Sequence, residues 1–205
     1  MGEVITMDEL YTCAVNFKKL LNSEYRFKVA KNSQILDIVL DFSVEDFHHL
    51  VGFKYLKELD IPRNKKLAFN SVLIKKITYD FVSTSKFFFN VENSYADIKS
   101  RIHCFQAVEE YLDTKNIIFK YVRDKNKYSH IDADFLIQSS LNHNTVYIFL
   151  KKRNPMDENS KYVMCSFFKK DLVIYYGDSV FWKYKEKYDK ENMISIVLWD
   201  SLELK

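Results

Sequence analysis

The sequence has little of the two residues that most often interrupt regular structure. Only three glycines and two prolines occur in 205 residues. This scarcity argues against a turn-rich sandwich and favours long regular elements. Long apolar runs are also missing, since none approaches the roughly 20 residues that a membrane-spanning helix needs. Glu3, Asp8 and Glu9 interrupt any signal-like start. We therefore expect a soluble chain with no membrane partner.

Cysteine and net charge are equally sparse. Cys13, Cys104 and Cys165 lie far apart and match neither a disulfide framework nor a metal-ligand spacing. We interpret them as reduced core thiols of a cytoplasmic protein. The formal charge is +3, from 31 basic and 28 acidic residues. Such a balance permits binding to nucleic acid but does not by itself indicate it.

Apolar and aromatic residues are abundant, at 47% and 16% of the chain, which argues against disorder over most of its length. The length predicts one domain over residues 1–205. Helical periodicity dominates up to residue 113 and strict alternation follows it. The pattern predicts an α+β fold, with N-terminal helices packed on a mainly antiparallel sheet formed by the C-terminal half.

The expected elements follow from these periodicities. Helices are predicted over residues 7–22, 67–77, 79–88 and 95–113. Strands are predicted over residues 25–29, 35–42, 117–122, 131–138, 145–152, 162–170 and 193–199. Residues 153–160 have the composition of a hairpin loop, and residues 175–189 fit either a loop or a helix. Ser43 and Asp46 have the spacing of a capping box at the start of a further helix, which carries a histidine pair.

Two segments place polar groups in surroundings that otherwise resemble a core. His48 and His49 lie on that largely apolar helix, with Gly52 close behind them. A glycine inside a helix costs about 1 kcal/mol relative to alanine, so Gly52 indicates a close approach by another backbone or a ligand. The alternative is a helix kink or a tight helix crossing. Asp132 and Asp134 alternate with apolar residues, so a strand there would have one acidic face.

Six short segments come in an order and spacing that resembles one group of nucleases. They span residues 47–53, 76–78, 101–102, 129–135, 147–150 and 166–168. Together they resemble the barnase–EndoU–colicin–RelE-like nuclease domains of phage and mobile-element proteins, in the fourth numbered subfamily. The resemblance covers residues 25–176, leaving residues 1–24 as an extra N-terminal helix and residues 177–205 as a C-terminal extension. It implies a compact α+β fold related to metal-independent ribonucleases and toxins, with no cofactor.

RNA cleavage without a metal needs a base for the 2′-hydroxyl, donors for the phosphate charge and an acid for the leaving oxygen. His49 matches the His-Leu-Xaa-Gly pattern of the family, so it is the candidate base or acid. Its alternative is a core histidine that donates to a backbone carbonyl. Lys54 and Arg101 are the candidates for phosphate stabilisation, and Asp134 with Ser129 for ordering the site. A solvated helix face would equally explain Lys54, and an internal ion pair with Asp134 would explain Arg101.

Substrate capture is predicted for residues in basic segments with interleaved aromatics, a composition typical of surfaces that bind single-stranded RNA. The segments span residues 115–128 and 182–188, although solvated strand exteriors have the same composition. The candidate substrate-binding residues are Lys120, Tyr121, Arg123, Lys151 and Ser166.

Three functions remain open from the sequence. The first is a metal-independent endoribonuclease with RNA as partner, in which His49→Ala abolishes cleavage and changes the thermal midpoint little. The second is a non-catalytic module on the same fold, which binds RNA or a protein (an inhibitor, or a host or phage partner) in phage–host conflict. The third is a metal-dependent phosphodiesterase built on Asp132 and Asp134. No third ligand is evident, so we expect no metal.

Overall fold

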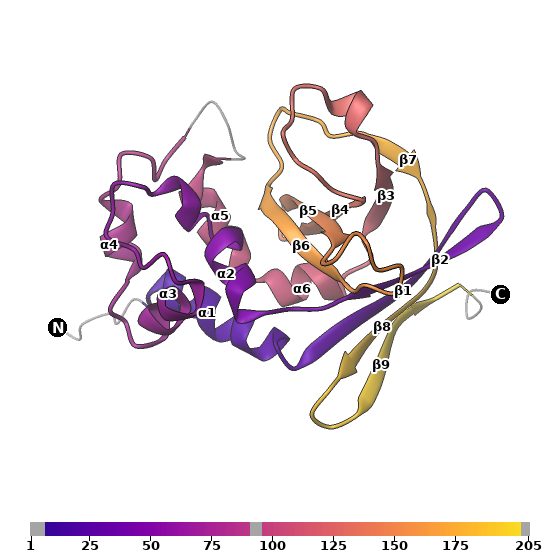
Figure 1. Ribbon diagram of the computed structural model, residues 1–205, viewed down its shortest axis with the longest axis horizontal. Coiled ribbons are helices and arrows are strands. Elements are labelled where there is room, and N and C mark those ends of the chain that lie inside the picture. Colours follow the sequence, from indigo (N-terminus) through magenta and orange to yellow (C-terminus); the bar gives the residue numbers. More distant parts are fainter. Residues whose placement is uncertain (1–6, 91–95, 202–205) are drawn as a thin grey trace.

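The computed structural model describes residues 7–90 and 96–201. The helices are α1 (Glu9–Leu20), α2 (Val44–Leu50), α3 (Lys65–Leu73), α4 (Tyr79–Ser83), α5 (Ile98–Phe105) and α6 (Val108–Asp113), with 3-10 turns η1 (Phe53–Tyr55) and η3 (Arg123–Asn126). The strands are β1 (Ser23–Lys31), β2 (Gln34–Leu40), β3 (Ile117–Tyr121), β4 (Phe135–Leu141), β5 (Asn144–Lys152), β6 (Tyr162–Lys169), β7 (Gly177–Ser179), β8 (Phe181–Asp189) and β9 (Ile194–Asp200). Helices α1 to α5 gather at one end of the molecule, the strands form a curled sheet at the other, and α6 lies against that sheet (Figure 1).

The strands pair in the order β7-β3-β4-β5-β6-β2-β1-β8-β9. All neighbours are antiparallel except β2 and β6, which meet in parallel at the single pair Leu40 and Tyr162. The predicted α+β class and the mainly antiparallel sheet are therefore confirmed. The sheet also takes β1 and β2 from the N-terminal part of the chain. None of the helices in the described ranges is long and apolar enough to cross a membrane.

The helix predicted over residues 79–88 ends at Ser83, as α4, and two further predicted elements are wrong in outline. The helix predicted over residues 95–113 is two helices, because Ala107 leaves the helical conformation (φ −103°, ψ 27°) between α5 and α6. Both helices bury their apolar faces, so the periodicity runs through the break without marking it. Residue 95 lies outside the described residues. Residues 175–189 form neither a loop nor a helix but contain β7 and β8, and β8 pairs along nearly all of β1.

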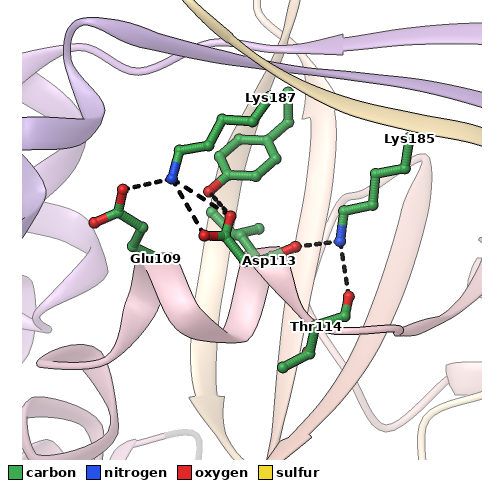
Figure 2. A network of polar contacts seen from close by, with 7 residues as sticks. Glu109, Asp113, Thr114, Lys185 and Lys187 are labelled. Carbon is green, nitrogen blue, oxygen red and sulfur yellow. Dashed lines mark hydrogen bonds and ion pairs between the residues drawn. The ribbon is translucent and has the colours of Figure 1, made fainter. Parts of the chain in front are cut away.

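Two lysines of strand β8 contact helix α6 and hold the two elements together (Figure 2). These contacts account for two of the lysines at alternate positions in β8. Lys185 is 2% exposed. Its Nζ donates to the carbonyl oxygens of Leu112 and Thr114 at the end of α6, and to Asn116 Oδ1 at 2.7 Å. The last carbonyls of a helix have no partner within the helix, so a lysine from the sheet satisfies them. Lys187 lies 2.5 Å from Glu109 and 3.2 Å from Asp113 on the same helix.

Helix α2 begins and ends as local chemistry requires. The predicted capping box is confirmed, with the Ser43 N–H donating to Asp46 Oδ2 at 2.8 Å and the Ser43 hydroxyl accepting in return. The helix stops at Leu50, so Gly52 is not inside it as predicted. Gly52 has a φ of 88°, a left-handed conformation that favours glycine. A Cβ there would lie 2.4 Å from Ile98 Cδ1, so the close approach is made by a side chain of α5 and not by another backbone.

Candidate active site

A cavity of about 360 Å³ opens between helix α2 and strand β6, which lie side by side in Figure 1. We call it the His49 cavity. Residues from four separate regions line it: α2 with η1, the first turn of α3, the segment before β4, and the β5–β6 hairpin. Of the predicted site residues, it brings together His49, Lys54, Lys151 and Ser166.

An irregularity in β6 positions the wall opposite helix α2. Phe149 pairs with Ser166 and Leu150 pairs with Met164, so Cys165 has no partner residue in β5. Such a bulge bends its strand and is frequent beside active sites. The ring Nε2 of His49 makes a short hydrogen bond with the carbonyl oxygen of Cys165. Since a carbonyl only accepts, Nε2 carries the proton, and Nδ1 is the ring nitrogen that can accept one.

Burial lowers the pKa of His49 to about 4. The hydrogen bond to Cys165 opposes this shift, and the nearby charges of Lys54, Arg101 and Lys65 add to it. The imidazole is therefore neutral at neutral pH, with Nδ1 unprotonated. Burial also raises the pKa of the Cys165 thiol to about 12, so that thiol stays protonated and is a poor nucleophile. His49 thus makes the hydrogen bond to a backbone carbonyl that is expected of a core histidine, and it also lines the cavity.

His130 lines the same cavity, and sequence reasoning gave it no role. It comes from the segment between η3 and β4, which is held by the Ser129 N–H donating to Asn126 O at 2.8 Å. The Cys165 thiol lies 3.4 Å from the Asp132 carbonyl and ties the segment to β6. The His130 side chain is exposed and has no hydrogen bond or ion pair within residues 7–90 and 96–201. The only sequence signal was its position inside the segment 129–135, one of the six that carry the resemblance.

The charges around the cavity favour an anion. Lys54, Lys65 and Lys151 line it. Two of the carboxylates at its edge are paired with cations outside the lining: Glu45 with Lys66 at 3.6 Å and Asp46 with Arg153 at 3.0 Å. Asp132 is exposed and also lines the cavity. Lys65 was not predicted, because its only signal is its place in the first turn of α3.

Three residues predicted to act in catalysis lie outside the cavity lining. Arg101 is 1% exposed, and its Nη1 donates to the Leu50 carbonyl at the end of α2, at 3.3 Å. An ion pair with Asp134 had been the alternative for Arg101, but Asp134 instead lies 3.6 Å from Lys120 Nζ. Asp134 also accepts from the Lys152 N–H at 3.1 Å. The Ser129 hydroxyl accepts from the Ile131 N–H at 3.1 Å.

The predicted acidic strand face is wrong, because β4 begins at Phe135, after both aspartates. Asp132 and Asp134 precede the strand, and only Asp132 lines the cavity. Within the described ranges, no three His, Cys, Asp or Glu side chains are grouped so that they could hold a metal ion.

The predicted substrate-binding residues divide between two places. Lys151 and Ser166 line the cavity, whereas Lys120, Tyr121 and Arg123 do not. Lys120 lies 4.4 Å above the ring of Phe135, besides pairing with Asp134. Tyr121 is buried, with its ring 5.4 Å from that of Phe149, and Arg123 is exposed on η3. The basic segment 115–128 therefore forms no single surface at the cavity.

One protein family matches almost the whole chain. Its model, described as phage-Barnase-EndoU-ColicinE5/D-RelE like nuclease 4, matches residues 9–201. The match extends beyond residues 25–176 at both ends and so includes α1, β8 and β9. No curated protein and no solved structure matches the chain.

Proposed function

The chain belongs to the phage-Barnase-EndoU-ColicinE5/D-RelE like nuclease family, and on this basis we propose that it is an endoribonuclease acting by general acid–base catalysis. The observation that carries the proposal is the His49 cavity. Two histidines from different elements, His49 and His130, line it together with three lysines. Acid–base cleavage of RNA commonly uses two proton-transferring groups, and histidine is well suited to either role.

In the proposed reaction His49 is the base. Its Nδ1 takes the proton of a ribose 2′-hydroxyl, and the 2′-oxygen attacks the adjacent phosphorus. The bond between phosphorus and the 5′-oxygen then breaks, and His130 gives that oxygen a proton. The products are a 2′,3′-cyclic phosphate and a free 5′-hydroxyl. Neither a metal nor a cofactor takes part in this scheme.

The lysines would stabilise the charge that builds up on the phosphate. Lys65 and Lys151 have no ion pair within the described part of the chain, so they are available to an anion. Both side chains are exposed, so this attraction acts through water and weakens with added salt. Ser166, 3% exposed at the cavity wall, supplies a hydroxyl for orientation. Arg101 supports this arrangement indirectly, since it holds the end of α2 and adds to the positive charge beside His49.

The test compares single histidine variants on total RNA and tRNA in the presence of EDTA. We expect the wild-type protein to produce fragments and His130→Ala to lose most of this activity. General acid–base groups typically contribute about 10²–10⁴-fold. His103→Ala is the matched control, because His103 is exposed and lies outside the cavity. Equal activity of His130→Ala and His103→Ala would remove His130 from the proposed site.

One observation favours a second function, a non-catalytic module that binds RNA or a protein partner. The Nε2 of His49 is engaged by a backbone carbonyl, and a pKa of about 4 makes its imidazole a weak base. A binding module would retain RNA with a steep salt dependence and release no fragments. Intact RNA after incubation with folded wild-type protein, with or without magnesium, would favour this function over the first.

A further inference from the structure

A second cavity, of about 630 Å³, adjoins the first through a shared wall. Lys54 lines both. The second cavity, which we call the His48 cavity, lies between η1, the following loop up to Arg63, and the side of α2 that carries His48. None of its lining other than Lys54 belongs to the proposed catalytic site.

The charged residues of the His48 cavity are mostly cationic. Lys57 and Arg63 are exposed and have no ion pair within the described part of the chain. Asp60 is the one carboxylate in the lining. With Lys54, three cations therefore face a single carboxylate, a balance that favours a phosphate.

The rest of the lining is apolar and aromatic. The ring of His48 meets that of Phe53 edge to face, with centroids 5.5 Å apart. Burial and the charge of Lys65 lower the pKa of His48, which keeps this imidazole neutral at neutral pH. Ile61 and Pro62, both half-buried, extend the apolar surface. Proteins that bind single-stranded RNA stack a base on a ring and neutralise the phosphate with cations. The His48 cavity offers both, with a neutral ring at the edge of a cationic pocket.

We propose that the His48 cavity is a nucleotide subsite, which binds the nucleotide next to the cleaved phosphate in single-stranded RNA. Lys57 and Arg63 hold the phosphate of this nucleotide, and its base lies against the half-buried ring of His48, which packs on the buried Phe53. Lys54 stands between the two cavities and contacts the phosphates on either side. This inference rests on the proposed function, because it takes the His49 cavity as the place of cleavage.

The test uses two RNA substrates and one paired variant. A dinucleotide contains a single phosphodiester, which lies in the His49 cavity, so it has no phosphate for Lys57 and Arg63. A strand of about ten nucleotides also places a phosphate in the second cavity. We expect Lys57→Ala/Arg63→Ala to raise KM for the longer strand and to leave cleavage of the dinucleotide unchanged. Lys18→Ala/Lys19→Ala is the control, because it removes the same charge from exposed positions on α1 that line neither cavity.

Binding is measured separately with a 2′-O-methyl strand, which lacks the attacking hydroxyl. The slope of log affinity against log salt should become shallower by about 0.7 for each phosphate that Lys57→Ala/Arg63→Ala no longer neutralises. The slope should not change in this way for the control.

Three outcomes are informative. Unchanged binding and cleavage of the longer strand by the paired variant would overturn the subsite and leave the proposed function intact. An equal loss on both substrates would also overturn it, because the two cations would then act in the His49 cavity. A third result would be that neither substrate is cleaved, while the slope of log affinity against log salt becomes shallower in the paired variant and not in the control. This result would contradict the proposed function and support the His48 cavity as an RNA-binding site.

Discussion

His49 joins helix α2 to the bulge in β6, so one imidazole both supports the fold and lines the cavity. His49→Ala would leave the Cys165 carbonyl without its donor, at a cost of about 1–3 kcal/mol. This differs from the expectation, based on the sequence, that the thermal midpoint changes little. His49→Gln is the better variant for activity, because an amide N–H can replace Nε2–H as donor while the proton-accepting Nδ1 is removed.

The same residue makes a prediction about pH. The pKa of His49 is lowered to about 4 in the folded protein, against about 6.5 in an unfolded chain. Between these values the unfolded state binds more protons, so the His49 contribution to stability declines as the pH falls from about 6.5 to about 4. We expect urea midpoints of the wild type to fall more steeply over this range than those of His49→Gln. Parallel curves for the two proteins would show that His49 is not held neutral by burial.

The sequence predicted some of the residues of the cavity and missed others for a physical reason. His49, Lys54, Lys151 and Ser166 were found because they lie within or beside the motifs that resemble the family. His130 lies within one of these motifs and Lys65 within none. Both were missed because only the packing of the chain brings their exposed side chains to the cavity. Arg101 looked suited to binding phosphate, but its burial beneath α2 gives it a helix carbonyl as partner.

At the scale of elements, Gly52 decides how closely α2 can approach α5. Gly52→Ala would force a Cβ to 2.4 Å from Ile98 Cδ1, at a φ of 88°. Strained backbone and overpacking each cost about 1–3 kcal/mol, so we expect a clear loss of stability in urea denaturation. Ile98→Val removes the clashing Cδ1 and alone costs about 0.5–1.5 kcal/mol.

A double-mutant cycle separates clash from strain. If the clash matters, the double variant Gly52→Ala/Ile98→Val will lose less free energy of unfolding than the two single variants lose in sum. Strictly additive losses would assign the whole cost to the backbone conformation of residue 52.

The contact of β8 with α6 makes a second prediction at this scale. Burial lowers the pKa of Lys185 to about 7, and the three acceptors around its Nζ match the three N–H groups of the ammonium form. Lys185→Met keeps most of the apolar stem but leaves these buried acceptors without their donor, so it should destabilise the protein by about 1–3 kcal/mol. Lys183→Met is the control, since Lys183 is exposed on the same strand. Equal thermal midpoints for the two variants would contradict this role for Lys185.

Elements were predictable where local chemistry sets them. The capping box at Ser43 predicted the start of α2, and alternation predicted β5 and β6 closely. The break between α5 and α6 has neither glycine nor proline to mark it. Strand β8 was missed because its inward lysines resemble a solvated face until α6 supplies their partners.

At the scale of the whole molecule, periodicity predicted an α+β class but not the order of the strands. The order depends on contacts between distant segments, such as β1 with β8 and the single parallel pair between β2 and β6. The same long-range closure places α2 beside β6 and creates the cavity at their junction. The sequence pattern could therefore predict the fold class, whereas the site could not be predicted without the strand order.

The most direct test of the proposed chemistry is mass spectrometry of the products from one oligoribonucleotide. It is incubated in EDTA beside an otherwise identical strand with a 2′-O-methyl group at the cleaved position. We expect a 2′,3′-cyclic phosphate and a 5′-hydroxyl from the first strand, none from the second, and neither product with His49→Gln/His130→Ala. Equal cleavage of both strands by the wild-type protein would contradict attack by the 2′-hydroxyl, and with it the proposed role of the His49 cavity.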